Sequence, residues 1–73
     1  MTFVYAHDIK NGDTFRYTSD WDILGKPIMS QPFLASDDAI VVGTQVMIPF
    51  GGDEGLCYMA SFGSKVEKID GTD

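Results

Sequence analysis

The side chains in this sequence that could do chemistry are its carboxylates, one histidine and one cysteine. His7 is the only imidazole and Cys57 the only thiol. Nucleophilic catalysis needs a nucleophile, a base and an orienting group that converge, and the sequence shows no such set. It also has no Cys–His spacing typical of zinc sites and no glycine-rich phosphate loop with a lysine. The sequence therefore predicts no enzyme, no metal site and no cofactor.

The carboxylates form short acidic groups in segments typical of turns. None has the spacing of a calcium loop, which supplies about six to eight oxygen ligands. Trp21 lies between two of these acids, and tryptophan is enriched at interface hot spots. It either plugs the open end of a β fold or is an exposed anchor. The candidate partner-binding residues are Asp20, Trp21, Asp22, Asp37, Asp38, Asp53 and Glu54.

The acidic segment Gly51–Gly55 resembles the Gly-Gly-Asp-Glu-Phe signature of diguanylate cyclases in all but its last position. Cyclase domains are much longer than this chain, and Gly55 stands where the signature has phenylalanine. We interpret the segment as an acidic hairpin loop, in which glycines adopt backbone conformations that other residues avoid.

Charge is the bulk property that says most about function. The chain has 5 Lys+Arg against 11 Asp+Glu, a net charge of −6. Because phosphates are bound by Lys and Arg, direct contact with nucleic acid is not expected. We expect a small acidic protein-binding module that occupies a site on a larger, basic partner. A sharper version is a phage-type or mobile-element-type inhibitor that presents carboxylates to a nucleic-acid-handling protein.

Two other hypotheses stay open. The first is a structural or assembly subunit that forms homo-oligomers through edge strands, at Ile28–Gln31, between two prolines, or at Val66–Ile69. The second is a small-molecule binder or enzyme that uses His7 and the aromatic side chains near it.

Length and composition predict one soluble domain over residues 1–73. The 44% hydrophobic content suits a globular core. One cysteine allows no intramolecular disulfide. The sequence shows no signal peptide and no apolar run of the roughly 20 residues that a membrane helix needs, so we expect a cytoplasmic protein.

Alternating apolar residues over Ala39–Phe50 predict the central strand, either continuous or interrupted at Gly43, where the chain either bends or makes a hairpin turn. We expect Asp37-Asp38 to join Phe33–Ser36 to this strand as a tight turn, pairing Ala35 with Ile40.

The remaining strands are expected at both ends of the chain. Phe3–Ile9 and Asp13–Tyr17 predict a hairpin with His7 on the aromatic face, near Phe15. Leu56–Phe62 alternates again, and Gly63-Ser64 predicts a hairpin turn, with glycine first, into a last strand at Lys65–Asp70.

Residues 19–24 predict at most one short helical turn, because Ser19 can cap it and Gly25 can end it. The pattern as a whole predicts a mostly-β fold: a small antiparallel barrel or a strongly bent sheet of about five to six strands, of SH3-like size.

Overall fold

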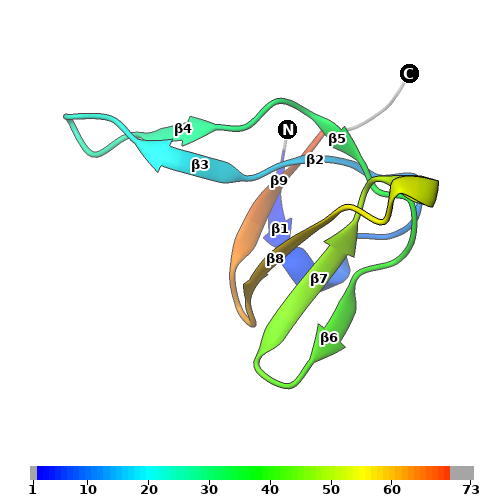
Figure 1. The fold of residues 1–73 in the computed structure, drawn as a ribbon. Coiled ribbons are helices and arrows are strands. Elements are labelled where there is room, and N and C mark those ends of the chain that lie inside the picture. Colours follow the sequence, from blue (N-terminus) through cyan, green and yellow to red (C-terminus); the bar gives the residue numbers. More distant parts are fainter. Residues whose placement is uncertain (1, 70–73) are drawn as a thin grey trace.

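The structure is a computed structural model that describes residues 2–69 (Figure 1). Within these residues the chain forms nine short strands and two single 3-10 turns. In chain order they are β1 (Thr2–Tyr5), η1 (Ala6–Asp8), β2 (Thr14–Arg16), β3 (Thr18–Trp21), β4 (Pro27–Met29), β5 (Phe33–Leu34), β6 (Ile40–Val42), β7 (Gln45–Pro49), η2 (Gly52–Glu54), β8 (Cys57–Ser61) and β9 (Lys65–Ile69).

The strands form three antiparallel sheets. Their orders are β1-β9-β2-β5, β6-β7-β8 and the two-stranded β3-β4. The prediction of a mostly-β fold is confirmed, and the sheets do not close into a barrel. The short helical turn predicted at residues 19–24 is wrong, because those residues form β3 and the turn after it. Over residues 2–69, no helix has the length and apolar character needed to cross a membrane.

The core lies between the two larger sheets, with Phe15 at its centre. Its ring is fully buried and lies 6.3–6.5 Å, centroid to centroid, from Phe33, Phe50 and Tyr58. The other buried apolar residues come from η1, the loop after it, the position directly after β5, and strands β7 and β9: Ala6, Ile9, Ala35, Val46, Ile48 and Val66.

The stretch predicted as the central strand is a hairpin that turns at Gly43. Val42 pairs with Gln45, and Gly43 takes the first central position with φ +62°. This is the arrangement of a type II′ turn, which matches the twist of hairpin strands. A two-residue turn pairs even-numbered residues of β6 with odd-numbered residues of β7. Because paired residues share a face of the sheet, the even-numbered residues of the two strands lie on opposite faces. Val46 and Ile48 are therefore buried, while Ile40 and Val42 lie on the opposite face and are exposed.

The hairpin predicted between Phe3–Ile9 and Asp13–Tyr17 is wrong. β1 pairs with β9, and β2 pairs with the other side of β9. The reason is η1, where the Ala6 N–H donates to the Ser64 carbonyl (2.8 Å) and the Ile9 N–H to the Ala6 carbonyl (3.2 Å). This turn buries Ala6 and Ile9, which an extended hairpin would not do.

The tight turn predicted at Asp37-Asp38 is also wrong. β5 pairs with β2 instead, and β6 pairs with β7. A two-residue hairpin turn there needs positive φ, and no non-glycine residue between 2 and 69 has it. Packing decides the outcome, because Phe33 lies 4.4 Å from Phe50, centroid to centroid, and joins the ring cluster around Phe15.

The connection from β8 to β9 is a corner between two sheets rather than the predicted hairpin. The Ser64 N–H donates to the Ser61 carbonyl (3.0 Å), and Gly63 holds the second central position with φ +95°. That is the requirement of a type II turn. The last strand is confirmed over Lys65–Ile69, whereas Asp70 lies outside the described residues. β9 lies between β1 and β2, so the free edge predicted at Val66–Ile69 is wrong.

Candidate functional site

The β3–β4 hairpin, here called the arm, projects away from the two larger sheets (Figure 1). Trp21 pairs with Pro27 at its outer end, and the pairing shifts register between Thr18 and Asp20. The strand predicted at Ile28–Gln31 is present as β4, two residues earlier at its end. No described residue from Thr18 to Met29 belongs to the buried core. The arm is therefore an appendage, because it adds little to the packing of the body.

Asp22 organises the tip of the arm. Its Oδ1 accepts hydrogen bonds from the backbone N–H groups of Leu24 (2.9 Å) and Lys26 (2.8 Å). The Asp22 N–H donates to the Lys26 carbonyl (2.8 Å), and the Gly25 N–H to the Asp22 carbonyl (3.0 Å). An aspartate that accepts backbone N–H bonds a few residues ahead is a common way to stabilise a turn. The tip therefore has a defined shape.

The tip presents large apolar side chains to solvent. Ile23 is 99% exposed, Leu24 78% and Trp21 61%. Trp21 is thus an exposed residue and does not plug the core. Isolated exposed apolar residues are common on proteins, but three within four positions at the end of a projecting hairpin form a patch typical of interaction sites. Sequence reasoning identified Trp21 and missed Ile23 and Leu24.

The missed signal was the turn chemistry. Asp22 and Gly25 are turn residues, and they enclose Ile23-Leu24. Apolar residues inside a tight turn have no sheet face to occupy, so they point away from both strands. A reading of Asp22–Gly25 as a hairpin tip would have placed them in solvent.

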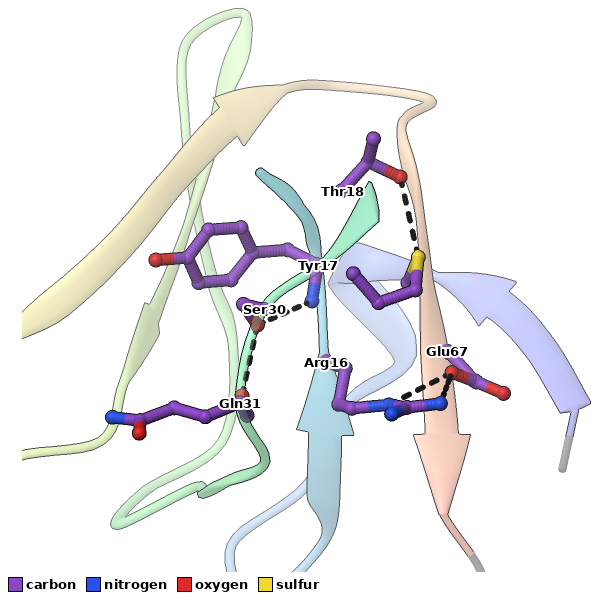
Figure 2. A network of polar contacts seen from close by, with 7 residues as sticks. Arg16, Tyr17, Thr18, Ser30, Gln31 and Glu67 are labelled. Atoms are coloured by element: carbon purple, nitrogen blue, oxygen red, sulfur yellow. Dashed lines mark hydrogen bonds and ion pairs between the residues drawn. The ribbon is translucent and has the colours of Figure 1, made fainter. Parts of the chain in front are cut away.

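Polar contacts tie the base of the arm to the body (Figure 2). The Tyr17 N–H donates to Ser30 Oγ (3.1 Å), and the Ser30 hydroxyl donates to the Gln31 carbonyl (2.8 Å). The Ser30 N–H returns a bond to the Tyr17 carbonyl (2.7 Å). Tyr17 in turn stacks on Tyr58 of β8, with centroids 4.3 Å apart. These contacts fix the direction in which the arm leaves the core.

The predicted acidic residues fall into two separate groups. Asp20 and Asp22 flank Trp21 on the arm, and Asp20 Oδ1 accepts the Trp21 N–H (2.8 Å). Asp53 and Glu54 are in η2, at the opposite side of the molecule (Figure 1).

Asp37 and Asp38 belong to the second group. The segment before them is linked to the start of the η2 loop, since the Ser36 N–H donates to the Pro49 carbonyl (2.8 Å). Asp37 Oδ1 accepts the Asp38 N–H, and Asp38 Oδ1 accepts the Asn11 N–H, both at 2.8 Å. The structure therefore joins Asp37 and Asp38 to the η2 side and keeps them apart from Trp21.

His7 lies in a second aromatic group instead of beside Phe15. Its ring stacks on Tyr5 (centroids 5.3 Å apart) and on Phe62 (4.8 Å). Its Nε2 lies 3.6 Å from Asp8 Oδ1, and its buried Nδ1 has no hydrogen-bond partner. Across residues 2–69 there is no group of three or more metal-ligand side chains, and the described chain has no pocket.

No protein-family model, no curated protein and no solved structure matches this chain.

Proposed function

We propose that this chain is a protein-binding module whose contact element is the arm. The observation that carries the proposal is the tip, where Trp21, Ile23 and Leu24 are exposed on a hairpin that the core does not use. Solvating such side chains is unfavourable, and burying one against a partner gains roughly 1.5–3 kcal/mol. Since Asp22 already fixes the turn, little conformational entropy is lost on docking.

The charge around the tip points to the kind of partner. Asp20 and Asp22 flank the apolar side chains, and Lys26 is the one base between Thr18 and Gly63. Acids at the rim of an apolar contact favour a groove bordered by Lys or Arg, chiefly by speeding encounter and excluding acidic proteins. We propose that the partner is a larger protein with an apolar groove and a basic border. We also propose that the two proteins meet in the cytoplasm, where the free Cys57 thiol stays reduced.

The test compares two variants that make the same Leu→Ser change at exposed positions. Leu24→Ser alters the tip (78% exposed), and Leu34→Ser alters β5 (61% exposed), outside the arm, as the matched control. A photo-crosslinking residue is placed at position 28 of the arm in each protein. Crosslinked proteins from a cell lysate are then quantified by mass spectrometry. We expect a defined partner with wild type and with Leu34→Ser, and a strong loss of that crosslink with Leu24→Ser, the tip variant.

The partner found this way is then purified and titrated by calorimetry. Trp21→Ala is expected to cost about 2 kcal/mol or more, as interface tryptophans do. Asp20→Asn is expected to slow association and flatten its salt dependence. Competition by nucleic acid for the same partner would support the inhibitor version. Equal crosslinking by the tip variant and the wild type would contradict an arm-based function.

A further inference from the structure

The β6–β7–β8 sheet has a second exposed apolar surface, on the side away from the core. Val46 and Ile48 of β7 are buried inward, so Gln45, Met47 and Pro49 point outward. The register places outward residues of β6 and β8 beside them. This surface, here called the outer face, consists of Ile40, Val42, Gln45, Met47, Pro49, Cys57, Met59 and Ser61.

The core does not use the outer face. Its apolar members are absent both from the buried core and from the half-buried residues that pack against it. Val42, Met59 and Ile40 are 56%, 52% and 47% exposed. In Figure 1, β1 and η1 lie behind this sheet, and no segment crosses in front of it. The outer face is therefore an unpartnered sheet face within the described chain.

The outer face also lacks charge, which is unusual for this protein. No strand residue of β6, β7 or β8 is acidic or basic, although the whole chain carries −6. A basic partner would find no acid there to attract it. The acidic surfaces elsewhere on the chain would repel a second copy, because like charges across an interface are strongly unfavourable. The outer face has no charge and would not repel it.

We infer that the outer face is a homodimer interface that packs against the same face of a second copy. An isologous contact of this kind has a two-fold axis. An axis running across β7 would set the two copies of β7 antiparallel. The acidic η2 turn of each copy then lies over the uncharged Gly43-Thr44 turn of the other, away from its own counterpart. The distribution of charge therefore favours a second copy of the chain as the occupant and the antiparallel arrangement of the two β7 strands.

The size of the outer face limits the strength of the dimer. Strands about 4.8 Å apart that rise about 3.4 Å per residue give a flat footprint of roughly 250 Å². Stable interfaces bury about 800 Å² per partner. The dimer is therefore weak and reversible, forming at high concentration. This inference does not depend on the proposed function, because the arm lies outside the outer face.

The experiment is sedimentation velocity from about 10 µM to about 1 mM, on wild type and on matched lysine variants. Met47→Lys puts a charge at the centre of the outer face, on a side chain that points away from the core. Ile23→Lys makes the same kind of charge change on the arm. We expect a concentration-dependent dimer in wild type and Ile23→Lys. Met47→Lys should weaken dimerisation about 100-fold or more, with an unchanged far-UV CD spectrum.

Two further measurements separate this interface from others. Val41→Pro removes an N–H that hairpin geometry directs away from β7, so it blocks pairing of β6 edges but leaves the outer face intact. We expect Val41→Pro to dimerise. High salt should leave the dimer intact, since no ion pair holds it. A wild type that stays monomeric at every concentration overturns the inference. So does a dimer lost in Val41→Pro or Ile23→Lys, or one that resists Met47→Lys.

Discussion

At the scale of single residues, the aspartates of this chain serve its backbone. The carboxylates of Asp20, Asp22, Asp37 and Asp38 each accept at least one backbone N–H, within strand β3 for Asp20 and in turns or loops for the other three. The Asp13 carboxylate accepts the Lys10 backbone N–H (2.9 Å) and also lies 3.6 Å from the Lys68 ammonium. Their clustering in the sequence therefore reflects the positions of turns as well as any role in binding.

The ion pair between Arg16 and Glu67 is a nearly buried contact whose loss is expected to lower stability. The two residues face each other across β2 and β9, and the Glu67 side chain is only 7% exposed. The Arg16 guanidinium donates to Glu67 Oε1 through Nε (3.0 Å) and a terminal nitrogen (2.6 Å; Figure 2). A buried carboxylate that loses its partner is costly, whereas removing both charges often is not.

We therefore predict that Arg16→Met lowers the free energy of unfolding by about 3 kcal/mol. The double variant Arg16→Met/Glu67→Leu should recover most of that loss, since no charge is left buried. Urea denaturation of the four proteins in this cycle measures both effects. A double variant less stable than Arg16→Met would show that Glu67 stabilises the fold by itself.

At the scale of elements, the arm shows how a short hairpin can persist without a core of its own. An isolated two-stranded hairpin is marginal in water. Here the base is held by the Tyr17–Ser30 bonds and the tip by the Asp22 carboxylate. Between them the Ser19 hydroxyl donates to the Ile28 carbonyl (3.0 Å). Local polar contacts thus replace hydrophobic burial along the arm.

The prediction for this element is that Asp22→Ala loosens the tip without unfolding the body. Loss of the carboxylate leaves the N–H groups of Leu24 and Lys26 without that acceptor, at a local cost of about 1–2 kcal/mol. Hydrogen exchange at the amides of Gly25 and of position 22 should accelerate about 10-fold, while core amides such as that of Val46 keep their protection. Asp53→Ala, in η2, is the control. An equal acceleration in the core would mean that the arm supports the whole fold.

At the scale of the whole molecule, aromatic rings join sheets that backbone hydrogen bonds do not. Tyr58 of β8 contacts Phe15 of β2 (6.4 Å) and stacks on Tyr17, which directly precedes the arm. Burial, and secondarily the nearby Tyr17 phenol, raise the pKa of Tyr58 above its usual value. The junction between the sheets therefore depends on keeping this phenol neutral.

This linkage predicts a loss of stability at alkaline pH. Because the folded pKa of Tyr58 is raised, the unfolded chain ionises first, and the free energy of unfolding falls as the pH rises above about 10. Below that pH the contribution is fully present. Tyr58→Phe should flatten the decline, whereas Tyr5→Phe, at an exposed ring, should not. Thermal denaturation between pH 8 and pH 11, roughly the range that spans a tyrosine pKa, measures the difference. Parallel declines in wild type and Tyr58→Phe would contradict the prediction.

The sequence by itself determined where most strands lie and some of the residues that they bury. Alternation identified β7 and β8. The buried face that it predicted included Val46 and Ile48, which are core residues, but also Ile40 and Val42, which are exposed. The last strand was also visible from local pattern. These features depend on the two-residue period of a strand, which any single segment carries within itself. Trp21 was recognised as a candidate contact for a similarly local reason, its residue type and acidic neighbours.

Only the tertiary structure decided which strands pair and where the exposed surfaces lie. β1 pairs with β9 instead of β2, because η1 buries Ala6 and Ile9 and reverses the chain. Gly43 turns the chain within the predicted central strand, which moves Ile40 and Val42 to the outer face. The arm tip and the outer face are defined by what the core leaves uncovered. Pairing and exposure arise from contacts between residues far apart in the chain, and a local pattern carries no information about those contacts.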